Sequence, residues 1–231
     1  MEYFELRGID ADVYANAELP TWLFEQIAAA PHTANILDFG CGFGQNIQAI
    51  KQHGFANVSG ADVNSHALKH CRTVGIEAFD VSTGFDELMA TGKRFDFIVT
   101  THVLEHIPKE QVVGVLTKLR GLLSKNGALL VAVPNAQAYT GCYWAYEDFT
   151  HHTLYTTGSL FFVLRAAGFL EIKLLDKYSV AGSKFLRRTV RLGFGALYRV
   201  NYGFWKRILG SPTHISSVDV FTYELKMRAE A

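Results

Sequence analysis

The stretch ILDFGCGFG, residues 36–44, decides the fold of this chain. It begins as an apolar strand that ends in an acid, Asp38, and continues as a turn with a glycine at every second position. Glycine adopts positive φ angles and lets a ligand approach the backbone, so such a turn before a helix is typical of a nucleotide-type ligand site. A dinucleotide fingerprint would have its third glycine at position 45, where Gln45 stands, and this weakens a pyrophosphate interpretation.

Around this stretch, short apolar segments alternate with segments of helical periodicity. The predicted strands are 35–38, 58–62, 76–79, 95–100 and 128–133. The predicted helices are a leading helix within 10–30, then 44–52, 65–73, 85–90 and 109–123. A further helix, 157–167, and two strands, 169–176 and 217–227, follow. Alternation of this kind predicts an α/β fold with a mostly parallel sheet and helices on both faces.

Acidic residues end three successive predicted strands. Asp38 ends the first, Asp62 ends the second, and Asp80, with Val81 beside it, follows the third. In a parallel sheet these ends share one edge, where a carboxylate can accept two hydrogen bonds from ribose hydroxyls. Asp80 and Val81 suit an adenine amino group and its ring. The acids therefore favour a ligand site over a purely structural role as helix caps.

The motifs from residue 34 to residue 134 resemble, in order and spacing, those of class I S-adenosylmethionine-dependent methyltransferases. The resemblance is carried by the 36–44 stretch, Asp62, Asp80-Val81, the strand FDFIV at 95–99 and the segment VLEHIP at 103–108. It implies a Rossmann-like seven-stranded sheet whose last strand is antiparallel and lies between the fifth and sixth. It also implies S-adenosyl-L-methionine as cofactor and S-adenosyl-L-homocysteine as product.

By this resemblance, the glycine turn wraps the methionine part, Asp62 holds the ribose, and His102 and Val103 line the floor near the sulfonium. Glu105 and His106 are expected mainly to shape the turn into the next helix. The predicted cofactor-binding residues are Asp38, Gly40, Cys41, Gly42, Gly44, Asp62, Val63, Asp80, Val81, His102 and Val103.

The loop after the fifth strand, residues 135–158, is the predicted acceptor site. It combines aromatic residues with an acid and two adjacent histidines, and an imidazole near neutral pH is a suitable base that a carboxylate can orient. Asp148, His151 and His152 are the main predicted catalytic residues, with His102 as a further candidate. Which of the two histidines is the base stays open, and no metal site is predicted.

The segment DFTHHTLYT, residues 148–156, sharpens the resemblance toward methyltransferases of bacterial surface polysaccharides, such as O-antigen or capsule. This implies O-methylation of a sugar hydroxyl, either on a nucleotide sugar or on a surface glycan. The glycan acceptor could be linked to a lipid. The alternatives are a small-molecule methyltransferase of quinone or aromatic type and a cofactor-binding protein without turnover. Nucleic acid is not an expected partner, because the core lacks an Asn-Pro-Pro-Tyr type loop.

The charge of the chain is unevenly distributed. The 22 Lys and Arg balance the 22 Asp and Glu, which argues against a uniformly basic nucleic-acid binder. Residues 183–210, however, contain seven basic residues and no acid. This segment, part of a predicted helical basic insertion at 182–210, has an apolar face with Phe and Trp, and its three glycines predict two short helices.

Three interpretations of the basic insertion stay open: ordinary packing on the sheet, contact with a membrane or a lipid-linked acceptor, and binding of an anionic acceptor. The three cysteines suggest no disulfide framework, and the first residues do not read as a signal peptide. We therefore expect one domain over residues 1–231, with residues 34–134 as the cofactor-binding core. Its expected location is the cytoplasm, either free or in peripheral contact with the inner face of the membrane. The oligomeric state is not predicted.

Overall fold

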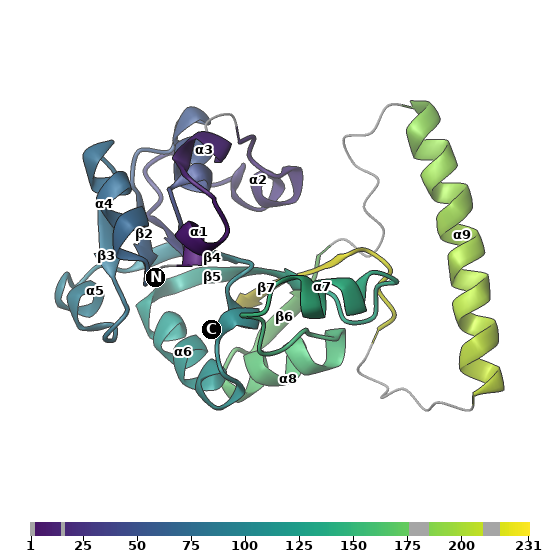
Figure 1. Cartoon of the computed structure of the whole chain (residues 1–231). Helices are drawn as coiled ribbons and strands as arrows, with labels where there is room; N and C mark the ends of the chain where they lie inside the picture. Colours follow the sequence, from purple (N-terminus) through teal and green to yellow (C-terminus); the bar gives the residue numbers. More distant parts are fainter. Residues whose placement is uncertain (1–2, 15–16, 176–184, 210–217) are drawn as a thin grey trace.

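A seven-stranded sheet forms the centre of the computed structural model, which describes residues 3–14, 17–175, 185–209 and 218–231 (Figure 1). The strand order is β3-β2-β1-β4-β5-β7-β6. β1 to β5 pair in parallel, whereas β7 runs antiparallel to both β5 and β6. The strands are β1 Ile36–Phe39, β2 Val58–Asp62, β3 Ala78–Asp80, β4 Phe95–Thr101, β5 Leu123–Pro134, β6 Glu171–Leu174 and β7 Glu224–Glu230. The predicted fold class is confirmed, including the position of the antiparallel last strand.

Helices cover both faces of the sheet, and each face has its own apolar core. On one face, α2, α3 and α4 bury residues such as Leu23, Ile47 and Leu68. On the other, α5, α6 and α8 bury residues such as Leu88 and Leu116. The helices are α1 Tyr3–Leu6, α2 Thr21–Ile27, α3 Gln45–Gln52, α4 Ser65–Thr73, α5 Asp86–Ala90, α6 Lys109–Leu122, α7 Gly141–Glu147, α8 Thr157–Ala166 and α9 Phe185–Ile208, with short 3-10 turns at Ala11–Tyr14 and Leu104–His106.

The strand register brings the predicted acids to one edge. Asp62 pairs with Asp80 at the ends of β2 and β3, and Asp38 pairs with Val99 near the end of β4. Because β1 to β4 are parallel, the loops that follow them open on the same side. The glycine turn and the loop that carries His102 are therefore neighbours, as the sequence predicts.

The prediction of one leading helix within 10–30 is wrong. The structure has a 3-10 turn at Ala11–Tyr14 and a separate α2 that begins after Pro20, and it adds α1, which the sequence analysis did not predict. Proline cannot continue a helix from the preceding turn, but it fits just before one. Residues 15 and 16, inside the predicted helix, lie outside the described residues.

The predicted strand bounds also differ, by two residues at 76–79 and 169–176, observed as Ala78–Asp80 and Glu171–Leu174, and by more in β5 and β7. β5 begins at Leu123, directly after α6, and not at residue 128. β7 begins at Glu224, because the carbonyls of Val220 and Thr222 accept hydrogen bonds from the Asn135 side chain and not from a strand. Residues 176 and 217, at the outer limits of the last two predicted strands, lie outside the described residues.

The basic insertion contains one long helix and not two short ones. α9 runs without a break over 24 residues and stands beside α7 at the edge of the molecule (Figure 1). Gly193, Gly195 and Gly203 each cost roughly 1 kcal/mol in a helix interior relative to alanine, which is too little to break a helix that is stabilised by tertiary contacts. Residues 182–184 and 210, at the ends of the predicted insertion, lie outside the described residues.

Candidate active site

The glycine turn between β1 and α3 has the backbone conformation that its sequence predicts. Gly40, Gly42 and Gly44 have φ angles of +80°, +50° and +84°. A Cβ atom on Gly40 would lie 2.1 Å from Cγ2 of Val103, so the Val103 side chain packs against the turn. There is no room for a side chain at position 40, so glycine is required there both for its positive φ and for this contact.

Asp62 fixes the glycine turn to the end of β2. One carboxylate oxygen accepts a hydrogen bond from the backbone N–H of Gly42 at 2.8 Å. The other accepts from the N–H of Asn64, also at 2.8 Å. Each carboxylate oxygen can accept a second bond. Asp62 therefore holds the turn in place and keeps the capacity to bind the two hydroxyls of a ribose.

Asp38 is a buried carboxylate without a hydrogen-bond donor. It is 1% exposed, and neither side-chain oxygen has a partner within the described part of the chain. Burial raises its pKa to about 7, with the nearby Asn46 amide opposing the rise and Asp62 adding to it. That amide donates to Oγ1 of Thr101 at 3.2 Å. An unpartnered buried carboxylate is costly, and a cationic group such as the ammonium of an amino acid would satisfy it.

The third acid, Asp80, lies at the end of β3, on the same edge of the sheet as Asp62. Asp80 accepts a hydrogen bond from the N–H of Ser82 at 2.8 Å, and hydrogen bonding by Ser82, through its side chain and then its backbone, lowers the pKa of Asp80. Val81 is buried, whereas Val63 is 64% exposed. Asp80 is thus ionised and accessible next to an apolar surface, as an adenine site requires.

Cys41 takes part in the turn through its backbone and not through its thiol. Its N–H donates to the carbonyl of Ala61, and its side chain is 1% exposed. The thiols of Cys41 and Cys71 lie 3.7 and 3.4 Å from the carbonyl oxygen of Gly42. The Cys41 side chain therefore packs below the turn, on the side of the core.

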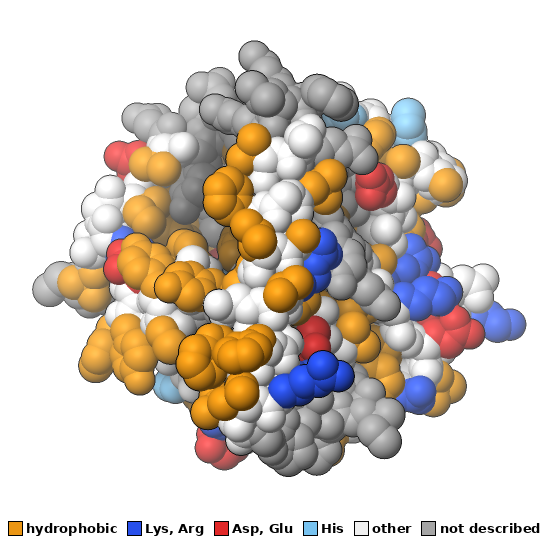
Figure 2. All heavy atoms as spheres, turned by 90° about the vertical axis from the view of Figure 1, so that its right-hand side faces the viewer, with side chains coloured by type: hydrophobic (Ala, Val, Ile, Leu, Met, Phe, Trp, Pro, Cys, Tyr) orange, Lys and Arg blue, Asp and Glu red, His pale blue; other side chains and the backbone are white. Residues whose placement is uncertain are grey.

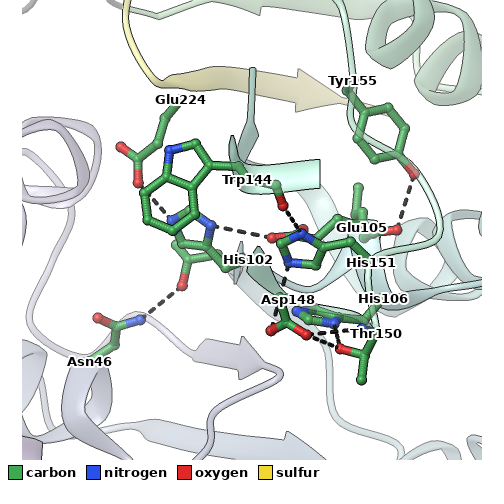
Figure 3. A network of polar contacts seen from close by, with 12 residues as sticks. Asn46, His102, Glu105, His106, Trp144, Asp148, Thr150, His151, Tyr155 and Glu224 are labelled. Carbon is green, nitrogen blue, oxygen red and sulfur yellow. Dashed lines mark hydrogen bonds and ion pairs between the residues drawn. The ribbon is translucent and has the colours of Figure 1, made fainter. Parts of the chain in front are cut away.

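His102 is held between two carboxylates at the end of β4 (Figure 3). Its Nε2 lies 2.7 Å from Oε1 of Glu224, and its Nδ1 lies 3.2 Å from Oε1 of Glu105. Although burial opposes the charge, these two carboxylates raise the pKa of His102 to about 10. His102 also has φ +56°, which is unusual for a residue with a side chain. It is an imidazolium near neutral pH and therefore not available as a base.

Asp148 and His151 come together in the acceptor loop, as predicted (Figure 3). Nδ1 of His151 lies 2.7 Å from the carbonyl oxygen of Trp144. Because a carbonyl only accepts, Nδ1 carries the proton, and in the neutral ring Nε2 carries the lone pair. Nε2 is 3.9 Å from Oδ2 of Asp148, close enough for the carboxylate to stabilise a protonated ring. Asp148 also accepts hydrogen bonds from Thr150 and pairs with Arg7.

His152 lies apart from this arrangement. Its backbone N–H donates to the carbonyl of Glu105 at 2.7 Å, and its side chain is exposed. Of the two adjacent histidines, it is therefore His151 whose ring lies beside Asp148. The buried Glu105 receives this backbone bond while its carboxylate contacts His102, so it both shapes the turn and belongs to the site.

Three side chains with cation-binding atoms cluster at His151. Glu105, His106 and His151 offer ligand atoms within 4.8 Å of one another, although no metal site was predicted. Ligands of a tetrahedral zinc ion, with bonds of about 2.1 Å, lie about 3.4 Å apart. In the structure His106 instead contacts Thr150 at 2.8 Å, and burial lowers its pKa. The side chains would have to move to hold an ion.

Three residues near the site were not found from the sequence. Glu224 begins β7, 122 positions after the histidine that it contacts. The ring of Phe4 in α1 packs at a tilt against Phe43, at 4.9 Å between ring centroids, and the turn after α1 provides Arg7. No local motif marks these residues, because each reaches the site through the tertiary fold.

The edge of the sheet thus has a glycine turn with positive φ angles, two hydroxyl-binding positions on Asp62, an ionised acid beside a valine, and a buried carboxylate that needs a cation. Together these fit the ribose, adenine and amino-acid parts of S-adenosylmethionine. When bound, this group supplies an electrophilic methyl carbon on a sulfonium.

Comparisons with known proteins identify the family of the chain. Residues 13–173 match the family model described as "Methyltransferase domain". A ubiquinone biosynthesis O-methyltransferase of Cereibacter sphaeroides is 30% identical over 119 residues, which is 47% of each chain, so the chain spans about half the length of the curated relatives it matches.

Solved structures share the fold over most of the chain. A SAM-dependent methyltransferase from Archaeoglobus fulgidus superposes over 100% of both chains with a TM-score of 0.65 and 19% identity. The plantazolicin methyltransferase BpumL, solved in complex with SAH, covers 90% of this chain and 79% of its own, with a TM-score of 0.54 and 17% identity. The chain belongs to the methyltransferase-domain family, and its fold is that of class I S-adenosylmethionine-dependent methyltransferases.

Proposed function

We propose that this chain is an S-adenosylmethionine-dependent O-methyltransferase in which His151 is the general base. The observation that carries the proposal is the hydrogen bond from Nδ1 of His151 to the carbonyl of Trp144, which leaves Nε2 as a proton acceptor. In the reaction, the acceptor oxygen forms a bond to the methyl carbon as the sulfur–methyl bond breaks, and the hydroxyl proton passes to Nε2. Asp148 then stabilises the imidazolium.

The acceptor that we favour is a sugar hydroxyl, on a nucleotide sugar or a surface glycan. An aliphatic hydroxyl is weakly acidic, so its methylation profits from a positioned base. Around α7, four aromatic side chains, Tyr139, Tyr143, Tyr146 and Phe149, are between 55% and 98% exposed. Exposed aromatic faces beside a base suit sugar rings of a large acceptor, which pack against them.

A second candidate is a phenolic hydroxyl of a quinone-type molecule. The name of the Cereibacter sphaeroides relative favours it, although the similarity covers only 47% of that protein. A phenol is more acidic than a sugar hydroxyl and depends less on a base. A third candidate, cofactor binding without turnover, leaves the His151 arrangement without a role.

An acceptor screen distinguishes the three candidates. The purified chain would be incubated with methyl-labelled S-adenosylmethionine and either nucleotide sugars, glycan fractions or polyprenyl phenols, with S-adenosylhomocysteine binding measured in parallel. Label in sugars supports the favoured function, and label only in phenols supports the second. Tight S-adenosylhomocysteine binding without transfer to either class would support the third and contradict the proposed role of His151.

A further inference from the structure

One side of α9 faces the body of the protein. Tyr198, Tyr202 and Lys206 recur every four residues and so lie on one side of the helix. The two tyrosine rings pack edge-on against Phe221, at 5.2 and 5.4 Å between centroids. The ammonium of Lys206 lies 3.1 Å from the carboxylate of Asp219. These contacts fix which side of α9 is turned inward.

The other side of α9 is apolar and exposed. Its large hydrophobic side chains are between 56% and 71% exposed, and they gather on the face of the molecule that Figure 2 shows. They are Phe194 at 69%, Leu197 at 66%, Val200 at 71%, Phe204 at 56% and Ile208 at 61%. Trp205, beside them, is 51% exposed. A surface helix normally buries such a face against the core, so this one fits a partner outside the body.

The charge of α9 indicates the nature of that partner. The helix contains six basic residues, Arg187, Arg188, Arg191, Arg199, Lys206 and Arg207, and no acid. A basic helix with an apolar face that includes Phe and Trp is typical of segments that lie in a membrane surface. No helix in the described part of the chain combines the length and apolarity that crossing a bilayer requires.

Two partners could cover this apolar face, a membrane or a second copy of the chain, and the charge of α9 distinguishes them. Lys206 is paired with Asp219, so two α9 helices packed on each other would oppose five positive charges with five more, and like charges at close range are unfavourable. An anionic lipid surface instead attracts each Lys or Arg near it by about 1 kcal/mol. Charge complementarity therefore favours anionic lipid.

We infer that α9 lies in the surface of an anionic membrane, with the face from Phe194 to Ile208 among the acyl chains. At 1.5 Å per residue, the helix would extend along the surface for about 36 Å. The hydroxyl of Tyr198 donates to the carbonyl of Gln137, and its ring lies 6.0 Å from that of Tyr139 in the acceptor loop. A membrane-bound α9 thus holds the acceptor loop next to the lipid, where the enzyme meets membrane-embedded molecules.

Vesicle co-sedimentation tests this inference without an acceptor. The full chain is expected to bind vesicles of phosphatidylcholine mixed with phosphatidylglycerol and to bind pure phosphatidylcholine much more weakly. The double variant F194S/F204S is expected to bind at least about 10-fold more weakly, because two exposed aromatic side chains are lost from the interface. The triple variant R187Q/R188Q/R191Q is expected to bind about 100-fold more weakly at low salt, because three charges are lost.

The matched control is Phe162→Ser on α8, since Phe162 is 69% exposed, like Phe194, but lies on another helix. It should bind vesicles as the unchanged chain does. Retained S-adenosylhomocysteine binding would show that each variant is folded. The inference is overturned if the unchanged chain binds neither type of vesicle, or binds both equally. It is also overturned if sedimentation equilibrium without lipid shows a dimer that F194S/F204S dissociates.

Discussion

His102 and Glu224 meet at 2.7 Å, between Nε2 and Oε1, although 122 positions separate them in the chain. With Glu105 on the other ring nitrogen, Glu224 keeps His102, whose φ is +56°, positively charged near neutral pH. The antiparallel last strand therefore provides more than a closing element of the sheet. It brings a carboxylate to the end of β4, next to the cofactor edge.

Replacing Glu224 should change the titration of His102. In Glu224→Gln the pKa of His102 should fall markedly from about 10, because one of its two carboxylate partners is lost. Stability should fall by about 1–2 kcal/mol at neutral pH, since a charge-assisted hydrogen bond is weakened. NMR titration of the His102 ring and chemical unfolding would measure the two effects. Glu230→Gln, on the same strand, should leave the His102 pKa unchanged.

The raised pKa of His102 also predicts a pH dependence of stability. A histidine titrates near 6.5 in the unfolded chain and at about 10 in the folded one. Its stabilising contribution is therefore complete below about pH 6.5 and is lost as the pH rises to about 10. Denaturant unfolding at several pH values should show this loss in the unchanged chain and a smaller one in His102→Gln. Equal slopes in the two proteins would contradict the charged pair.

The two adjacent histidines provide a matched pair for the catalytic assignment. His151→Ala should lower kcat by about 10²–10⁴-fold with little change in S-adenosylhomocysteine binding, because the base is lost. His152→Ala should leave kcat within a few-fold, because its side chain is exposed and only its backbone contacts Glu105. Steady-state kinetics with an identified acceptor would measure both. A larger loss in His152→Ala would reverse the assignment.

Asp38 should make cofactor affinity dependent on pH. Its pKa of about 7 means that the carboxyl is increasingly neutral as the pH falls below 7, and a neutral carboxyl binds an ammonium poorly. Affinity for S-adenosylhomocysteine should fall up to about 10-fold per pH unit in that range, as for a single required ionisation. Calorimetry between pH 5.5 and 8 would test this.

The same residue predicts an opposite effect on the protein without cofactor. Because the folded pKa of Asp38 lies above its unfolded value, the ionised carboxylate destabilises the free protein as the pH rises from about 4 to 7. Asp38→Asn should bind cofactor weakly yet unfold at a higher denaturant concentration at pH 8, by about 1–2 kcal/mol. A less stable variant at pH 8 would argue against a strained carboxylate.

The contact between Gly40 and Val103 can be tested by adding one methyl group. Gly40→Ala should destabilise the protein by about 2–3 kcal/mol, because the new Cβ would lie 2.1 Å from Val103 and φ is +80°. G40A/V103A should recover part of this loss, namely the steric part. Gly114→Ala in α6 has open space and should instead stabilise by about 0.5–1 kcal/mol. Thermal or denaturant unfolding would measure all three.

The features that depend on local sequence pattern could be predicted from the sequence. The glycine turn, the acids at the strand ends and the alternation of strands and helices follow from short-range rules, and the structure has all of them. The position of β7 between β5 and β6 came from family resemblance, since no pattern within residues 224–230 specifies a neighbour. The surroundings of His102 could not be predicted either, because its second carboxylate comes from that same strand.

The errors have physical causes as well. Local propensity predicts a break of α9 at its three glycines, whereas contacts of Tyr198 and Tyr202 with Phe221 stabilise the continuous helix from outside. The apolar residues Leu19, Leu23 and Ile27 have helical spacing on both sides of Pro20, so the pattern predicts one helix where α2 in fact begins after the proline. The choice between His151 and His152 depends on burial, which two adjacent residues in a loop do not reveal.

The placement of β7 constrains the order in which the sheet can be completed during synthesis. Within the described residues β6 forms its ladder with β7, so β6 cannot join the sheet until a strand that emerges some 50 residues later has been made. Until then, the outer edge of β5, with its run of buried aliphatic residues from Ala128 to Val133, is an unpaired strand edge. Such edges associate readily with other chains. Because of this topology, nascent or truncated chains that lack β7 are prone to aggregate.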